Sequence, residues 1–166
     1  MSYFVIVRGP LGIGKSTIAK KLTKILKAKY ISMDEIVDKN LVTNKPDKNG
    51  MMDVKNFIRA NKLIQPITFK FFKKNKSVIT DGCFYHKEQI VDIIDKLKPY
   101  KVYIFDLKAS INICIERDKK RKVSIGKDAT KAVYNAVSKF SVGIKIDNSK
   151  KISNEAVQEI LKYLPR

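Results

Sequence analysis

The stretch that decides the fold is Gly9-Pro10-Leu11-Gly12-Ile13-Gly14-Lys15-Ser16, which matches the pattern G-x-x-x-x-G-K-S of a phosphate-binding loop. A short apolar run at residues 3–7 precedes it, and apolar residues recur at helical spacing over residues 18–26 behind it. The pattern requires this setting, with a strand before the loop and a helix after it. We therefore expect backbone N–H groups of the loop to hold phosphate oxygens, Lys15 to reach the β and γ phosphates, and the Ser16 hydroxyl to bind Mg²⁺.

Strands and helices alternate along the rest of the chain. Further strands are expected at residues 30–33, 77–80, 101–107 and 143–146. Helices are expected at residues 34–37, 57–72, 86–97, 110–117, 129–140 and 154–163. Pro66 should begin or kink a helix, and the polar residues 42–50 should form a loop, the most mobile part of the chain. The alternation predicts an α/β fold, a parallel sheet covered by helices on both faces, in one domain over residues 1–166.

The composition indicates the general class of the protein. The 166 residues are 44% hydrophobic, enough for one substantial core, and no apolar run approaches the length of a membrane span. We expect a soluble, cytoplasmic protein with no signal peptide and no membrane partner. Cys83 and Cys114 lack the spacing of a zinc site and are expected to be buried, reduced thiols.

The net charge of +19 is the unusual feature of the composition. A positive field of this size attracts polyanions, so nucleic acid is one interpretation. The excess comes from 30 Lys against 5 Arg and is spread along the whole chain, although bidentate phosphate recognition favours Arg. A general lysine bias, with the lysines solvated on helix surfaces, explains the same charge. Both interpretations stay open.

Carboxylates follow three of the predicted strands. Ligands of parallel sheets bind at the carboxyl ends of the strands, so Asp34, Asp81 and Asp147 are expected to converge on the loop. Asp81 has the position of a carboxylate that holds Mg²⁺, unless it only turns the chain before a glycine. Asp34 is placed to orient an acceptor hydroxyl and take its proton, unless it serves as a helix N-cap. His86, the single histidine, is expected to be a surface residue.

The order of these motifs resembles a known family, the P-loop kinases related to polynucleotide kinase, shikimate kinase, adenylylsulfate kinase and chloramphenicol phosphotransferase. The likeness spans nearly the whole chain, and its first motif is the specific one. The segments that carry it are residues 9–17, 32–34, 78–82, 115–121 and 146–149. The resemblance implies a three-layer P-loop kinase fold, with a five-stranded parallel sheet in the order 2-3-1-4-5 and a small lid at about residues 117–130.

The same resemblance assigns roles to residues. Asp34 would face the acceptor hydroxyl, and Asp81 would lie near the metal. Arg117 and Arg121 would belong to the lid, one near the adenine and the other near the transferring phosphates. They are two of only five arginines in the chain, which supports a need for guanidinium geometry; a solvated basic helix end is the alternative. The expected sets are catalytic Lys15, Asp34 and Arg121; metal-binding Ser16 and Asp81; and nucleotide-binding Gly9, Pro10, Leu11, Gly12, Ile13, Gly14, Lys15, Ser16, Thr17 and Arg117.

Together these features predict an ATP- and Mg²⁺-dependent phosphotransferase that moves the γ-phosphoryl group to a hydroxyl. A nucleic-acid 5′-hydroxyl, in RNA or DNA, is the preferred acceptor because it would use the positive field, and a small-metabolite hydroxyl is the alternative. A nucleoside monophosphate kinase is a further alternative. The acidic pair Asp34-Glu35 argues against it, since Val37 and Asp38 stand where many of the resembled kinases carry an Arg. The last alternative is a regulatory or RNA-binding protein that binds ATP and transfers nothing.

Overall fold

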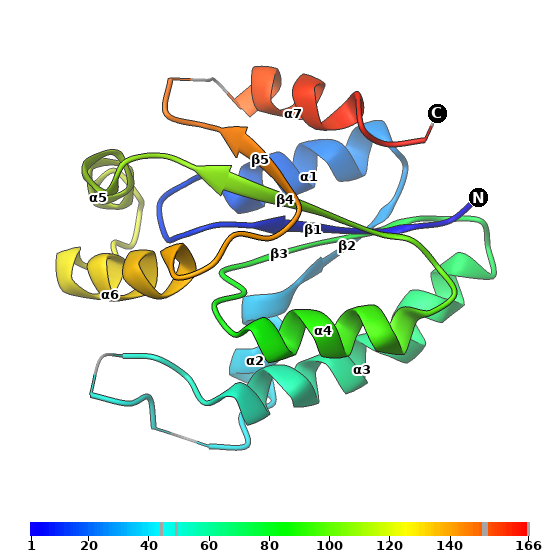
Figure 1. Ribbon diagram of the computed structural model, residues 1–166, viewed down its shortest axis with the longest axis horizontal. Coiled ribbons are helices and arrows are strands. Elements are labelled where there is room, and N and C mark those ends of the chain that lie inside the picture. Colours follow the sequence, from blue (N-terminus) through cyan, green and yellow to red (C-terminus); the bar gives the residue numbers. More distant parts are fainter. Residues whose placement is uncertain (44, 49, 151–152, 166) are drawn as a thin grey trace.

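The sheet is the frame of the molecule. The computed structural model describes residues 1–43, 45–48, 50–150 and 153–165. Within these ranges the five strands are β1 (Phe4–Arg8), β2 (Lys29–Ser32), β3 (Val78–Gly82), β4 (Val102–Lys108) and β5 (Ile144–Asp147). All of their pairings are parallel, and the order across the sheet is β2-β3-β1-β4-β5 (Figure 1). The predicted parallel sheet and its strand order are confirmed.

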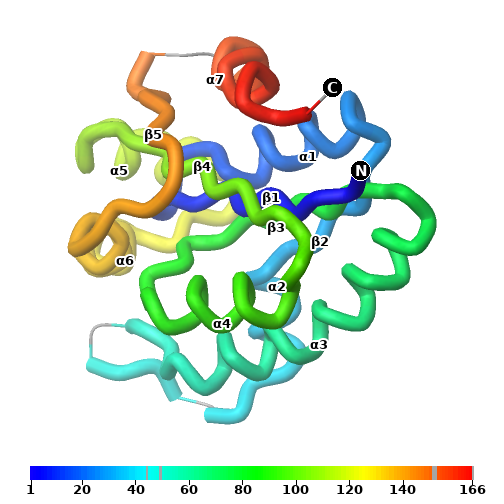
Figure 2. The backbone as a smooth tube through the Cα atoms, turned by 45° about the vertical axis from the view of Figure 1, so that its right-hand side comes forward, coloured from blue at the N-terminus to red at the C-terminus, as the bar shows by residue number. Residues whose placement is uncertain are grey.

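Helices cover both faces of this sheet. The helices of the described ranges are α1 (Lys15–Ile25), α2 (Met33–Lys39), α3 (Val54–Phe72), α4 (Lys87–Leu97), α5 (Ile111–Lys119), α6 (Lys127–Ser138) and α7 (Ser153–Leu161). The two views agree that α1 and α7 lie on one face and α3 and α4 on the other (Figures 1 and 2). The pair α5 and α6 lies beyond the carboxyl ends of the strands, at the position expected for a lid.

The central strand β1 explains why the core has two parts. All five of its residues are buried, as in a strand covered on both faces. Successive side chains of a strand point to opposite faces. Val5 and Val7 therefore pack in the cluster that includes α1 and α7, whereas Phe4 and Ile6 pack in the cluster with α3 and α4. The loop that follows β1 is thus held between two packed layers.

The helix α3 runs without interruption through Pro66. It begins much earlier than the proline, after Asp53, whose carboxylate accepts a hydrogen bond of 2.7 Å from the N–H of Lys55. A proline inside a helix removes one backbone hydrogen bond, and burial of one helix face outweighs this loss. The expectation that Pro66 begins a helix is wrong. The buried face consists of Asn56, Phe57, Ala60, Asn61, Ile64, Thr68 and Phe72.

A buried ion pair and its hydrogen bonds connect the end of β1 to α6. Arg8 is fully buried, and its Nη1 donates to Oδ1 of the fully buried Asp106 at 2.7 Å. Its other nitrogens donate to the carbonyl oxygens of Phe84 at 3.0 Å and of Val137, near the end of α6, at 2.7 Å. The guanidinium also lies 4.3 Å from the ring centroid of Phe140. The residue directly before the phosphate-binding loop thus anchors α6.

The two cysteines meet an expectation drawn from composition. Cys83 and Cys114 are buried and free of disulfide bonds, as predicted. No described helix combines the length and the apolar character needed to cross a bilayer.

Candidate active site

The phosphate-binding loop has a backbone conformation that depends on its glycines. Gly12 and Gly14 have φ angles of +75° and +97°, in the left-handed region. A Cβ at Gly12 would lie 2.2 Å from the carbonyl oxygen of Cys114, so a larger residue lacks space as well. Gly14 is the N-cap of α1 and offers no side-chain cap. The N–H groups of the first helical turn are therefore available to an anion.

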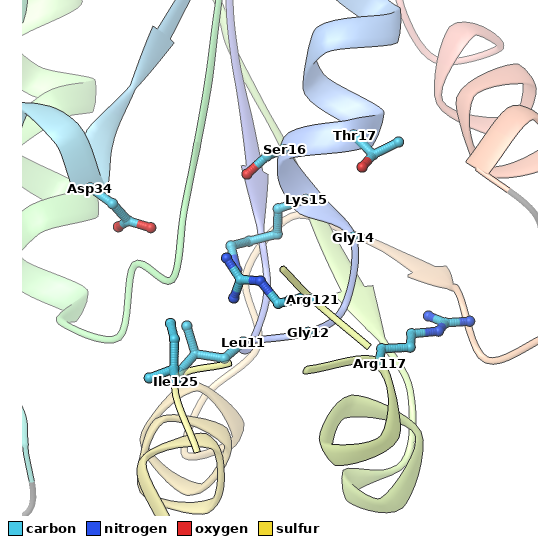
Figure 3. A pocket seen from close by; sticks show the side chains of 10 residues that line it. All are labelled: Leu11, Gly12, Gly14, Lys15, Ser16, Thr17, Asp34, Arg117, Arg121 and Ile125. Carbon is cyan, nitrogen blue, oxygen red and sulfur yellow. The ribbon is translucent and has the colours of Figure 1, made fainter. Parts of the chain in front are cut away.

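The loop forms one wall of a cavity of about 250 Å³ (Figure 3). Asp34 projects into this cavity from the opposite side, and the α5–α6 connection closes a third side. We call this space the main cavity. It brings together most of the residues predicted for the nucleotide and for catalysis. Its lining consists of Leu11, Gly12, Gly14, Lys15, Ser16, Thr17, Asp34, Arg117, Arg121 and Ile125.

Three predicted nucleotide-binding residues lie beneath the cavity surface instead of lining it. Ile13 is fully buried in the core on the α1 side of the sheet. A Cβ at Gly9 would lie 2.9 Å from Cγ2 of Ile13, so the close packing of the loop requires a glycine there. The carbonyl oxygen of Pro10 accepts a hydrogen bond of 2.8 Å from Nζ of Lys15. These residues give the loop its shape.

Lys15 is a buried cation at the centre of the main cavity (Figure 3). The thiol of Cys83, from the end of β3, lies beside it. Burial raises the pKa of this thiol to about 11, although the Lys15 ammonium opposes the change. Cys83 is therefore a neutral neighbour of Lys15 at physiological pH. The sequence identified Cys83 only as a packing residue, because nothing in its local pattern indicates that its thiol lies beside Lys15.

Ser16 and Asp81 lie together as predicted for a magnesium site. Oγ of Ser16 donates to Oδ2 of Asp81 at 2.5 Å, and the hydroxyl of Tyr30 donates to Oδ1 at 2.6 Å. Asp81 is 2% exposed and lies within β3, so the alternative that it only turns the chain is excluded.

These donors suit Mg²⁺, because it prefers hydroxyl and carboxylate oxygens and usually completes its octahedron with phosphate oxygens and water. Among the described residues no group of three or more His, Cys, Asp and Glu side chains is arranged to hold a metal ion. A cation at Ser16 and Asp81 would therefore depend on the nucleotide for further ligands.

Asp34 is not the N-cap of α2, so the alternative that it serves as a helix cap is excluded. The N-cap is Ser32, whose Oγ accepts a hydrogen bond of 3.4 Å from the N–H of Glu35. The strand β2 ends at Ser32, two residues before Asp34. Asp34 lies in the first helical turn with its carboxylate directed into the main cavity (Figure 3). It is therefore available for chemistry.

Charges from four residues act on the Asp34 carboxylate. Solvent reaches it through the open cavity, yet the surrounding protein removes much of its hydration. This desolvation raises the pKa of Asp34 above its ordinary value; Lys15 opposes the shift, Asp81 and Asp38 add to it, and Arg121 opposes it. A carboxylate with a raised pKa is a stronger base when it is ionised.

Two arginines reach the main cavity from the lid. Arg117, in α5, donates to the backbone carbonyl oxygens of Asn148 and Ser149 at 2.9 and 3.1 Å. Arg121, in the connection after α5, lies 3.3 Å from the carboxylate of Asp118 and points toward the middle of the cavity (Figure 3). Both line the main cavity, which argues against a merely solvated helix end. Their contacts with adenine and phosphate stay predictions.

Asp118 organises the lid, although the sequence did not single it out. It is 2% exposed, and one carboxylate oxygen accepts hydrogen bonds from the Ser124 hydroxyl at 2.7 Å and from the N–H groups of Ile125 and Gly126, both at 3.1 Å. Desolvation raises the pKa of Asp118, but these bonds and Arg121 outweigh it and hold the pKa below its usual value. An ionised Asp118 thus closes the α5–α6 connection into a tight turn.

The polar residue that β5 delivers to the site is Asn148, and the expectation for Asp147 is wrong. Asp147 is exposed and accepts a hydrogen bond from the N–H of Ser149 at 2.9 Å. Neighbouring side chains of an extended segment point to opposite sides. Asn148 is consequently buried, and its amide donates to the carbonyl oxygen of Ile13 in the loop at 2.6 Å. It supports the phosphate-binding loop from behind.

His86 is half-buried, so the expectation of a surface residue is wrong. Its Nε2 lies 2.9 Å from the carbonyl oxygen of Met52, and its ring packs against Phe57 and Tyr85 at centroid distances of 5.3 and 4.7 Å. The N–H of Met52 donates to the Tyr85 hydroxyl at 3.0 Å, and burial raises the pKa of that hydroxyl to about 12. These contacts hold the segment before α3 against the end of β3.

A second cavity, of about 420 Å³, lies between this segment and α6; we call it the side cavity. Met51 and Tyr85 line it, and both pack on the same small cluster as Leu11, which lines the main cavity. One residue that lines the main cavity and two that line the side cavity therefore pack on the same cluster. The full lining is Asp47, Met51, Tyr85, His86, Ala132, Asn135, Ala136 and Lys139.

Solved structures with the same fold cover almost the whole chain. A sugar kinase from Janibacter sp. HTCC2649 is 14% identical and matches 98% of this chain and 94% of its own, with a TM-score of 0.72. A gluconokinase from Sinorhizobium meliloti 1021 is 13% identical and matches 96% of this chain and 90% of its own, with a TM-score of 0.70. A tunicamycin resistance protein from Deinococcus radiodurans is 15% identical and matches 98% of this chain and 95% of its own, with a TM-score of 0.71. At such identities the likeness establishes the fold.

Sequence comparison leads to the same class of protein. A search of curated proteins finds no match to the chain. The AAA domain family matches residues 4–140, from β1 through the lid. The predicted P-loop kinase fold is confirmed. Because the match runs without a break over residues 4–140, which include the loop, Asp34, Asp81 and the α5–α6 connection, the chain belongs to the AAA domain family.

Proposed function

We propose that this protein is an ATP- and Mg²⁺-dependent kinase that transfers the γ-phosphoryl group to a hydroxyl of a small metabolite. The observation that carries the proposal is the position of Asp34, whose carboxylate enters the main cavity opposite Lys15 and Ser16 (Figure 3). Ser32 caps the helix, so the helix itself does not require Asp34. A carboxylate in this place can orient an attacking hydroxyl and accept its proton.

The other residues of the main cavity fit the donor side of this reaction. The loop N–H groups and Lys15 would hold the phosphates, and Arg121 would add positive charge where the transferred group passes. Ser16 and Asp81 would hold Mg²⁺, which neutralises charge on the β and γ phosphates when it is bound. Asp34 would take the proton of the acceptor hydroxyl as the new oxygen–phosphorus bond forms.

A small acceptor is better supported than a nucleic acid. Two of the structural neighbours are named as kinases of small molecules, a gluconokinase and a sugar kinase. The charge of +19 does not single out one segment, because it comes from 30 Lys against 5 Arg that are spread along the whole chain. The comparisons thus favour the alternative over the nucleic-acid acceptor preferred from charge alone.

The side cavity is the space that we assign to the body of the acceptor. Met51 and Tyr85 of its lining pack on the same cluster as Leu11 of the main cavity, and it offers polar groups from Asn135, Lys139 and Asp47. This mixture suits a compound with several hydroxyls and an apolar edge. Among the described residues that line it there is no arginine, which argues against an acceptor phosphate and so against a nucleoside monophosphate.

The test uses ATP labelled in the γ-phosphate, with a panel of sugars, sugar acids, amino sugars, nucleoside monophosphates and 5′-hydroxyl oligonucleotides. We expect labelled product with a small hydroxyl compound. Asp34→Asn should bind ATP normally by calorimetry and form no product, whereas Glu35→Gln, an exposed neighbour in the same turn, should keep activity.

Two results would overturn the proposal in different ways. Transfer to oligonucleotides alone would replace the small acceptor with a nucleic acid. Slow ATP hydrolysis that Asp34→Asn leaves unchanged, with no labelled acceptor in the panel, would favour the regulatory ATP-binding alternative.

A further inference from the structure

Asp81 receives hydrogen bonds on both of its carboxylate oxygens from two different elements. Ser16, at the start of α1, donates to Oδ2 at 2.5 Å, and Tyr30, in β2, donates to Oδ1 at 2.6 Å. The Ser16 contact belongs to the predicted metal site. The Tyr30 contact joins residues 51 positions apart and has no part in the loop motif.

The sheet register explains why Tyr30 reaches this carboxylate. The strands β2 and β3 are parallel neighbours, with Tyr30 opposite Ile79 and Ser32 opposite Asp81. Asp81 lies two residues beyond the partner of Tyr30, so the two side chains point to the same face of the sheet, the one covered by α1. On this face Tyr30 packs against the α1-side core, and Nζ of Lys20 lies 5.6 Å from its ring centroid. The phenol is held in place from two elements.

The Tyr30 hydroxyl is the donor in this contact. An ionised carboxylate can only accept hydrogen bonds, so the phenol O–H donates to Oδ1 of Asp81. A carboxylate that accepts from a single hydroxyl remains free to rotate, whereas two donors on its two oxygens fix its plane.

We infer that Tyr30 is a positioning residue for the metal site: it holds Asp81 so that Oδ2 and the Ser16 hydroxyl face the place of Mg²⁺ on the nucleotide. This inference rests on the proposed use of MgATP and adds a residue from outside the loop motif. Tyr30 itself touches neither nucleotide nor metal in this assignment. Partners of metal ligands of this kind typically change metal affinity about 10- to 100-fold when they are removed.

The experiment measures ATP binding by calorimetry in Mg²⁺ and in EDTA, without any acceptor. Tyr30→Phe removes only the hydroxyl. Tyr134→Phe is the matched control, because it removes a half-buried tyrosine hydroxyl that donates to the carbonyl oxygen of Ala109 at 3.1 Å, away from Asp81. We expect Tyr30→Phe to reduce the gain in ATP affinity from Mg²⁺ by about tenfold or more, with the affinity in EDTA unchanged. Tyr134→Phe should keep the gain of the wild type.

The outcomes separate this inference from the proposed function. If the wild type gains affinity from Mg²⁺ and Tyr30→Phe gains as much, the positioning role is refuted while the kinase proposal stands. If Tyr30→Phe and Tyr134→Phe lose affinity equally in both conditions, the hydroxyl acts on general stability, and the inference is also refuted. A wild type that binds no ATP in either condition would refute both proposals. Thermal unfolding of each variant checks that the fold is intact.

Discussion

The two halves of the site are built in different ways. The donor half, residues 9–17, is one contiguous loop and helix start, in which Gly9 and Gly12 have no room for a side chain and Ile13 is fully buried. The acceptor half takes Asp34 from α2, His86 from the N-cap of α4 and the segment before α3, with the side cavity between that segment and α6. Asp34 and Asp47 on this side are exposed. One half is rigid and local, and the other is open and assembled from distant segments.

This difference explains how one fold serves several acceptors. The phosphates of ATP are constant, so a loop that binds them tolerates little change. The acceptor varies, and its contacts come from surface segments that a rigid sheet positions. The donor half therefore indicates the type of reaction, whereas the identity of the substrate depends on the acceptor half.

The largest effect is expected from one substitution in each half. Lys15→Ala should lower kcat/KM by about 10²–10³-fold and weaken ATP binding, because it removes charge from the phosphates. Asp34→Asn should lower kcat by about 10²–10⁴-fold and leave ATP affinity unchanged, because it removes only the base. Steady-state kinetics and calorimetry measure both. If Asp34→Asn weakens ATP binding as much as Lys15→Ala does, the two halves are not functionally separate.

The rigidity of the two halves can be compared by substituting two glycines that have nearly the same φ angle. Gly12 in the loop and Gly50 beside the acceptor half have φ of +75° and +76°. A Cβ at Gly12 would meet the Cys114 carbonyl oxygen at 2.2 Å, whereas one at Gly50 would meet nothing within 4 Å. Gly12→Ala should lower the free energy of unfolding by about 2–5 kcal/mol, and Gly50→Ala by about 1–2 kcal/mol from backbone strain alone. Equal losses in chemical denaturation would contradict the proposed difference.

The lid connection should respond to acid through Asp118. Because its pKa is lower in the folded state than in the unfolded state, the ionised carboxylate stabilises the fold above its unfolded pKa of about 4, and this contribution is lost as the pH falls through the folded value. Asp118→Asn should lower the free energy of unfolding by about 1–3 kcal/mol at neutral pH. It should also weaken the fall of stability at acid pH. Thermal unfolding measured as a function of pH tests both effects. Glu116→Gln, an exposed change in the same helix, should behave as the wild type, and an unaltered acid limb in Asp118→Asn would contradict the assignment.

The smallest expected effect is a shift of the pH profile of catalysis. The raised pKa of Asp34 places the acid limb of kcat/KM above the pH expected for an ordinary carboxyl group, since the base must be ionised. Asp38 adds to this shift from the same helix, so Asp38→Asn should move the limb to lower pH. Movement in the opposite direction, or a limb that Asp34→Asn retains, would exclude Asp34 as the base.

Much of the donor half could be predicted because its residues are neighbours in the chain. The loop motif, its strand and its helix lie within residues 3–26, and Asp81 follows a strand that the sequence marks clearly. Errors arose where side-chain direction decides the outcome. Asp147 was chosen at the end of β5, but the alternation of the extended chain buries Asn148 instead.

Burial also overrode local signals that the sequence carries. Pro66 indicates a helix break, yet α3 continues through it because its buried face packs against the sheet. A single histidine has no pattern that predicts its surroundings, and His86 contacts Met52 and Phe57, which come from a segment that meets it only in the fold.

The sequence by itself determined the parallel α/β fold and the phosphate-binding loop, because these depend on short-range patterns of glycine, charge and hydrophobic spacing. Only the tertiary structure decided that Tyr30 supports Asp81, that Cys83 lies beside Lys15 and that Arg8 anchors α6. Each of these contacts joins residues more than 50 positions apart. They follow from the register of the strands and from the direction of individual side chains, which no local pattern encodes.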